Sequence, residues 1–284
     1  MGKLNLEPMT EAQMKLCLLD ILSYVDSWCN THNIRYYLMY GTLLGAIRHK
    51  GFIPWDDDID IAMPRKDYEL FMRTFSSKDS NNRYSVVNVN NTRGYYLQFG
   101  KVVDNTTLLK EHLKGGIEIG VYIDIFPLDN LTREGGTSEE CQEDIRHLIK
   151  RIKPYRDILN AKLHPWDKKR TLMRNVIAAI ISYLPIPKKF LINKIDKIAR
   201  YYENEENPEY IGVAVFNIYR GKEAIKAEFF REIKRMKFEG RDFNVPVGYD
   251  GILSRTYGDY MTPPPEKDRI SHHDYEVYRL INNN

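Results

Sequence analysis

The chain has 284 residues, which is long enough for one large domain or two modest ones. Hydrophobic residues make up 43% and charged residues 29%, with a mean hydropathy of −0.50, a composition that excludes disordered, collagen-like and coiled-coil classes. Lys and Arg number 42 against 39 Asp and Glu, and the formal charge of +3 is too small to predict a nucleic-acid partner.

The cysteines at positions 17, 29 and 141 form no CxxC pair and have no metal-finger spacing. We therefore expect neither a disulfide framework nor a structural zinc site. No long apolar stretch follows the first residues, so the sequence predicts no secretory signal and a location in the cytosol.

Helices and strands are predicted to alternate along the first part of the chain. Thr10 and Gln13 form a capping box before a helix over residues 10–30, whose apolar positions recur at helical spacing: Met14, Leu18, Ile21, Leu22, Val25 and Trp28. A strand over 35–40 is ended by Gly41-Thr42 before a short helix reaching about Gly51. A helix over 66–75 and strands over 59–63, 84–89, 97–104 and 121–126 complete an α/β (α+β) pattern.

The predicted organisation has three parts: a catalytic core with its N-terminal helix over 1–136, a helical insert over 137–209, and a C-terminal segment over 210–284 that completes the active site. Breaks in the insert are expected at Pro154, Pro165, Pro185 and Pro187. In the C-terminal segment we expect a hairpin over 237–245 turning at Glu239-Gly240, a helix around 249–257 and a loop at the prolines 263–265.

An apolar run over 176–184 is too short to span a membrane and is flanked by basic residues at 168–170 and 188–189. That layout suits a helix lying at an anionic membrane surface. A buried helix with solvated ends explains the run better on periodicity alone.

Four aspartates fall within residues 56–60. Because Ile59 and Ile61 alternate with Asp58 and Asp60, a strand here places both carboxylates on one face. Two such carboxylates suit a hard divalent cation, Mg²⁺ or alternatively Mn²⁺. A solvated loop or helix cap is the alternative interpretation.

Asp124 interrupts an apolar strand over 121–126, where an unpaired charge would be costly. It is the candidate third carboxylate, although it could instead cap a neighbouring backbone. Asp56 and Asp57 are second-choice metal ligands.

Gly41 and Thr42 lie at a strand-to-helix turn, where amide groups and a hydroxyl can bind phosphate. Arg48, His49 and Lys50 at the end of the same helix extend this predicted phosphate edge. A solvated basic helix end is equally compatible with these three residues.

Three ordered blocks, residues 40–61, 123–129 and 257–273, resemble the signature of the LicD family, phosphocholine transferases of bacterial surface glycans that are distantly related to fukutin-type proteins. The resemblance implies a nucleotidyltransferase-like fold with a mixed sheet core. Gly41-Thr42, Asp58 with Asp60, and Asp124 fall on that fold's glycine turn, Asp-x-Asp strand and third acidic strand.

The implied reaction is Mg²⁺-dependent transfer of phosphocholine from CDP-choline to a sugar hydroxyl of a teichoic-acid, lipopolysaccharide or capsule precursor, releasing CMP. Asp58 and Asp60 would bind the metal, and Asp124 would be a third ligand or the general base. Candidates to hold the donor phosphates are Arg48, Lys50, Arg269, His272 and His273, although the histidine pair could equally be a surface dipeptide. Candidate aromatic contacts of the choline group are Trp55, Trp166, Tyr95, Tyr96, Tyr257 and Tyr260.

Other hypotheses share part of this interpretation. The donor could be CDP-ribitol, CDP-glycerol or CDP-ethanolamine, the enzyme could attach the nucleotide itself, or the chain could be a silent binding module. For the leading reading we expect a glycan or lipid-linked glycan acceptor, reached at the inner membrane face through peripheral contact over 168–189.

Overall fold

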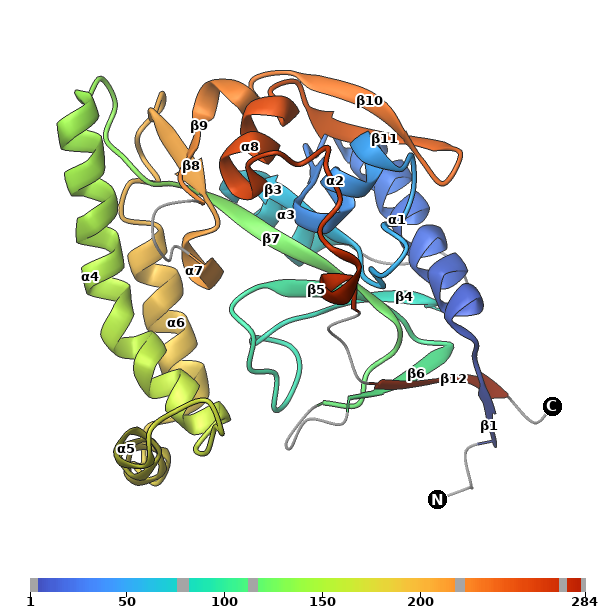
Figure 1. Cartoon of the computed structure of the whole chain (residues 1–284), viewed down its shortest axis with the longest axis horizontal. Coiled ribbons are helices and arrows are strands. Elements are labelled where there is room, and N and C mark those ends of the chain that lie inside the picture. The colour runs from blue at the N-terminus through green and yellow to red at the C-terminus, as the bar shows by residue number, and fades with distance from the viewer. Residues whose placement is uncertain (1–4, 76–81, 112–116, 218–222, 271–274, 282–284) are drawn as a thin grey trace. The chain divides into compact units, whose positions relative to one another are not determined.

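The computed structural model describes residues 5–75, 82–111, 117–217, 223–270 and 275–281. It combines helices with β-strands, so the predicted α/β class is confirmed (Figure 1). The chain divides into two compact units, the first built from Met1–Asn88, Phe99–Pro127 and Glu228–Asn284, and the second from Val89–Gln98 and Leu128–Ala227. The segment predicted as a helical insert falls within the second unit.

The main sheet of the first unit has the strand order β2-β3-β7-β5-β4. These strands are β2 Tyr37–Leu38, β3 Asp60–Pro64, β7 Tyr122–Asn130, β5 Gly100–Asp104 and β4 Tyr84–Val87. The pairs β2–β3, β5–β7 and β4–β5 are antiparallel. β2 is shorter than predicted because Tyr40 already belongs to the following helix.

Three helices accompany this sheet: α1 Glu11–His32, α2 Tyr40–Arg48 and α3 Arg65–Thr74. The capping box before α1 is confirmed, since Thr10 Oγ1 accepts from the Gln13 amide and the Gln13 side chain accepts from the Thr10 amide. All six apolar residues predicted for its inner face are buried. Gly41 and Thr42 lie within the first turn of α2, whereas the sequence placed them ahead of the helix.

A second sheet, of order β1-β12-β6, joins the two ends of the described chain. Its strands are β1 Asn5–Pro8, β12 Tyr275–Ile281 and β6 Thr107–Glu111. Both pairings are antiparallel, with Asn5 opposite Ile281. The sequence patterns had predicted none of these strands.

The predicted hairpin is present as β10 Ile233–Phe238 and β11 Arg241–Pro246. Glu239 and Gly240 form its turn with positive φ angles of 47° and 76°, as two-residue hairpin turns require. α8, Tyr249–Tyr257, matches the predicted helix. Short 3₁₀ turns cover Ala227–Phe230 and Glu266–Asp268.

The second unit contains the helices α4 Ser138–Leu163, α5 Leu172–Ser182, α6 Lys188–Ala199 and α7 Ala214–Asn217. β8, Tyr210–Gly212, pairs with the end of β7 and with β9, Ile225–Lys226. The break predicted at Pro154 is wrong, because α4 continues through it. Buried residues on both sides of the proline, including Ile152 and Leu159, hold the helix in place despite the lost hydrogen bond.

The expectation of a buried helix over 176–184 is also wrong. Val176, Ile177 and Ile180 on α5 are 47%, 51% and 64% exposed, and Tyr183 just after it is 88% exposed. Within the described ranges, no helix combines the length and the apolar character needed to cross a bilayer.

Candidate functional site

Burial alternates along the acidic segment as predicted, although the strand β3 begins only at Asp60, one residue later than expected. Ile59 and Ile61 are fully buried, whereas Asp58 and Asp60 remain partly exposed. The Asp124 amide donates to the Ile59 carbonyl at 2.9 Å. The strand β7 therefore brings Asp124 beside the segment that carries Asp58 and Asp60.

The electrostatics of Asp60 show how closely these carboxylates gather. Burial raises the pKa of Asp60 well above its usual value, and the negative charges of Asp58, Asp124 and Asp56 raise it further. The positive charge of Lys101 lowers the pKa of Asp60. Asp60 therefore shares its site with three other carboxylates, each of which makes ionisation of Asp60 more costly.

Lys101 is a site residue that sequence reasoning missed. It is buried on β5, directly opposite Asp124 on β7, and its Nζ lies 2.5 Å from Asp124 Oδ1. The same Nζ lies 3.4 Å from the centroid of the Tyr122 ring, a cation–π contact. A lysine inside the apolar strand Gly100–Asp104 was the available signal, since a buried lysine needs a partner.

The first turn of α2 positions the acids directly. The buried Thr42 hydroxyl accepts a hydrogen bond from the Asp60 amide at 2.8 Å, which fixes the start of β3. Tyr40, with a φ of 48°, makes the sharp turn from β2 into α2. The turn predicted to bind phosphate therefore also holds Asp60 in place.

Gly41 leaves room for another member of the cluster. A Cβ at Gly41 would lie 2.4 Å from Asp56 Oδ2, so the Asp56 carboxylate sits against the first turn of α2. The positive end of a helix dipole favours a carboxylate at this position. The loop before these acids is fixed by a residue that is distant in the sequence, because the Phe52 amide donates to Glu239 Oε1 at 3.0 Å.

Two arginines provide a basic side to the site. Arg48 donates to the Tyr260 carbonyl at 2.7 Å, and Arg269 donates to the Pro264 carbonyl at 2.8 Å. Burial lowers the pKa of Arg48, and the positive charge of Arg269 contributes in the same direction. Two guanidinium groups close enough to repel each other are a suitable arrangement for binding an anion between them.

Tyr257, at the end of α8, reaches the acidic cluster. Although 44% of the residue is exposed, burial of its hydroxyl raises the pKa of Tyr257, and Asp60, Asp56 and Asp58 raise it further. Tyr257 is therefore close enough to these three carboxylates for their charge to act on its hydroxyl.

The other predicted contacts are distributed as follows. Trp55 carries the Arg269 guanidinium 5.4 Å from its ring centroid, and the buried Tyr260 donates to Asp250 Oδ1 at 2.6 Å. Lys50 donates to the Ile47 carbonyl at its own helix end. Tyr95, Tyr96 and Trp166 belong to the second unit, and His272 and His273 lie outside the described residues.

The carboxylates of the site are suitable ligands for a hard divalent cation. Asp56, Asp58, Asp60 and Asp124 offer carboxylate oxygens, the ligands that Mg²⁺ and Mn²⁺ prefer, and the positive charge of Lys101 lowers the pKa of Asp60. In the part of the chain that the structure describes, no three acidic, histidine or cysteine side chains already converge as a ready metal site.

Comparison with known proteins shows which family this segment resembles. Residues 33–143 match the family model described as LicD/FKTN/FKRP, nucleotidyltransferase domain. That segment contains the α2 turn, all four carboxylates and Lys101. The chain is also 32% identical over 281 residues to the lipopolysaccharide cholinephosphotransferase LicD of Haemophilus influenzae, a match that covers 97% of this chain and 100% of that protein.

Two shorter matches involve uncharacterised proteins, RP689 of Rickettsia prowazekii and RT0683 of Rickettsia typhi. Each is 42% identical over 52 residues, 18% of this chain.

Proposed function

Because this chain belongs to the LicD family, we propose that it is a transferase that moves phosphocholine from CDP-choline to a sugar hydroxyl of a bacterial surface glycan precursor, with release of CMP. The observation that carries the proposal is the gathering of four carboxylates beside two arginines in the part of the chain that the family model matches. The acceptor that we propose is a teichoic-acid, lipopolysaccharide or capsule precursor.

Asp58 and Asp60 would hold Mg²⁺ or Mn²⁺, with Asp56 as a further ligand. Such an ion neutralises phosphate charge and polarises the bond to the leaving group. Both roles foreseen for Asp124, metal ligand and acceptor of the sugar proton, need its ionised form. The ammonium of Lys101, 2.5 Å away, favours that form.

The remaining residues orient the donor. Arg48 and Arg269 would bind the pyrophosphate oxygens, and the Tyr257 hydroxyl would donate a hydrogen bond beside the carboxylates. The amides of Gly41 and Thr42, in the first turn of α2, would support one phosphate. Positioning and charge neutralisation of this kind supply most of the catalysis in phosphoryl transfer.

A titration tests the donor. Purified protein is titrated with CDP-choline, CDP-ethanolamine, CDP-glycerol and CDP-ribitol, first with Mg²⁺ and then with the metal chelated. We expect metal-dependent preference for CDP-choline and release of CMP when an acceptor glycan is added. Preference for another CDP-alcohol would keep the mechanism and change the donor, whereas a product that retains CMP would indicate a nucleotidyltransferase.

Replacing Asp60 by Asn tests the metal site. The change removes a ligand together with a carboxylate whose pKa is raised by burial and by its neighbours, so we expect transfer to be abolished while the urea unfolding midpoint stays equal or rises. Asp20→Asn, at a half-exposed aspartate on α1, is the matched control and should keep transfer. Normal turnover by the Asp60 variant would contradict the metal assignment.

We also propose that α5 rests on an anionic membrane, where a lipid-linked acceptor would be found. Its exposed apolar side chains include Leu172, Met173, Val176, Ile177 and Ile180. Basic residues flank this face on both sides, at 168–170 and 188–189. An apolar face with basic flanks is the pattern of helices that lie in the interface of anionic bilayers.

Vesicle sedimentation tests this contact. We expect binding to phosphatidylglycerol vesicles, weaker binding to phosphatidylcholine vesicles, and loss of binding in the double variant Ile177→Glu, Ile180→Glu. Leu16→Glu, the same change at an exposed leucine on α1, is the control and should bind as the wild type does. Equal sedimentation of the double variant and the wild type would contradict the proposal.

A further inference from the structure

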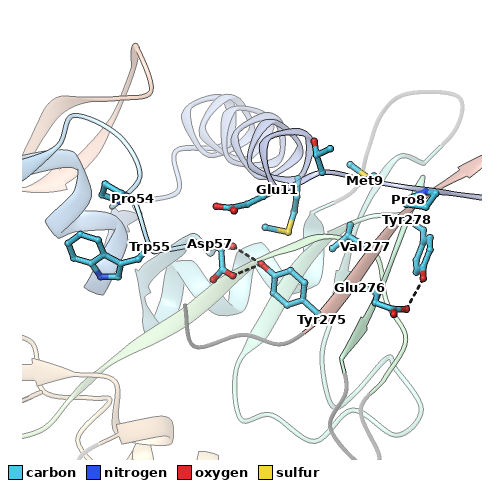
Figure 2. Close-up of a pocket in the computed structure, with 12 residues that line it drawn as sticks. Pro8, Met9, Glu11, Pro54, Trp55, Asp57, Tyr275, Glu276, Val277 and Tyr278 are labelled. Carbon is cyan, nitrogen blue, oxygen red and sulfur yellow. Dashed lines mark hydrogen bonds between the residues drawn. The ribbon is translucent and has the colours of Figure 1, made fainter. Parts of the chain in front are cut away.

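A cavity of about 550 Å³ opens in the first unit next to the acidic loop (Figure 2). Its walls come from the segment at the start of α1, from the loop before β3 and from β12. The volume lies in the range usual for small-molecule sites. None of the residues discussed above as phosphate contacts is among its described lining, whereas Trp55, a candidate aromatic contact of the choline group, is.

The described lining is negatively charged. It contains Glu11, Asp57 and Glu276 and no lysine, arginine or histidine. Tyr275, in the same wall, donates a hydrogen bond to Asp57. Lys15 pairs with Glu11 at 2.7 Å and offsets part of this charge, while Asp57 precedes Asp58 directly in the sequence, so the acidic lining continues toward the proposed metal ligands. A lining with more acids than bases favours a cationic ligand group.

The hydrogen bonds of the lining suggest which kind of cation fits. Tyr275 donates to Asp57 Oδ2 at 2.7 Å, and Tyr278 donates to Glu276 Oε2 at 2.7 Å (Figure 2). These two carboxylates already accept hydrogen bonds from the protein. A quaternary ammonium has no N–H to donate, so it can bind here through charge and apolar contact without needing a hydrogen-bond acceptor.

Apolar and aromatic groups complete the cavity. Met9, Met14 and Val277 supply apolar surface, and Trp55 and Tyr275 supply aromatic rings. Trp55 already carries one cationic group, the guanidinium of Arg269, against its ring. Methyl groups on a positive nitrogen pack well against such walls, because they combine apolar surface with a charge that aromatic faces attract.

We infer that this cavity binds the quaternary ammonium group of the donor, with Glu11, Glu276 and Tyr275 as its specificity-determining residues. The inference rests on the proposed function, which supplies a donor with a trimethylammonium group. It assigns the selection of choline over ethanolamine to the cavity formed by β12 and the start of α1, and not to the carboxylates that bind the metal.

Isothermal titration of the full chain tests the inference. We expect the double variant Glu11→Gln, Glu276→Gln to bind CDP-choline about 2- to 30-fold more weakly, the range expected for loss of cation recognition. CMP, which lacks the ammonium, should bind equally to the wild type and the variant. Glu7→Gln, on β1 opposite Arg279 and outside the cavity, is the matched control and should bind both ligands as the wild type does.

Tetramethylammonium, titrated alone, tests the cavity without the nucleotide. Saturable binding that the double variant weakens would support the inference, and its absence from the wild type would overturn it. Unchanged CDP-choline binding by the variant would also overturn it while leaving the proposed function intact. A wild type that binds tetramethylammonium and CMP but gains nothing from CDP-choline would instead contradict the donor assignment.

Discussion

Replacing Lys101 by Met should strongly destabilise the fold at neutral pH. The lysine is buried, its Nζ lies 2.5 Å from Asp124 Oδ1, and its charge lowers the pKa that Asp60 would otherwise have. Methionine has a similar length and no charge, so the change removes the cation that lies against Asp124.

The expected cost is about 3–5 kcal/mol, the usual result of removing one partner of a buried ion pair. The two side chains are only 5% and 15% exposed, so solvent screens this interaction little. Urea unfolding followed by circular dichroism measures the cost. The loss should shrink as the pH falls, because protonation removes the charges that Lys101 had balanced.

The double variant Lys101→Met, Asp124→Asn is the decisive control. It removes both charges of the pair, so it should regain much of the stability that the single variant lost. Lys15→Met, at a partly buried lysine on α1 that pairs with Glu11, should cost about 1 kcal/mol or less. A single variant within 1 kcal/mol of the wild type, or a double variant no more stable than the single one, would refute this account of Lys101.

Gly45→Ala should destabilise the chain by about 1–3 kcal/mol in urea unfolding, because its Cβ would lie 2.4 Å from the carbonyl oxygen of Gly51, a backbone atom that cannot turn away. Gly41→Ala is the contrast, since its Cβ would meet only a carboxylate that can rotate; equal losses in both variants would contradict the reasoning. Burial alone would raise the pKa of Asp144, but hydrogen bonds from Arg133 outweigh it and the pKa is lowered. This stabilisation is present above about pH 4 and is lost as the pH falls through the lowered pKa of Asp144. Asp144→Asn should therefore reduce the free energy of unfolding by about 1–3 kcal/mol at pH 7 and by much less at pH 2. An equal reduction at both pH values would contradict this account of Asp144.

Features coded by neighbouring residues were predictable from the sequence. The capping box of Thr10 and Gln13 is closed within one helical turn, and the hairpin turn at Glu239-Gly240 depends on two adjacent residues. The alternation around Ile59 likewise follows from the two-residue period of a strand. Short-range patterns of this kind fix a local structure whatever the rest of the chain does.

Features that depend on distant partners were not predictable. Lys101 faces Asp124 only because of the register between β5 and β7. Tyr275 bonds to Asp57 across 218 residues of sequence, and Glu239 holds the loop at Phe52 across 187. Periodicity identified the apolar run of α5, but it does not reveal whether a neighbouring element covers that face.

The charge balance of the site accounts for a link between protons and metal. Lys101 can compensate one carboxylate, and the remaining acids, together with burial, hold the pKa of Asp60 well above its usual value. If Asp58 and Asp60 bind a divalent cation, as we propose, protons compete with the ion for Asp60, so the apparent affinity for the ion should fall as the pH is lowered. The negative charges around Asp60 oppose the loss of its proton, and the same charges favour the binding of a cation. Proton loss and cation binding are therefore coupled.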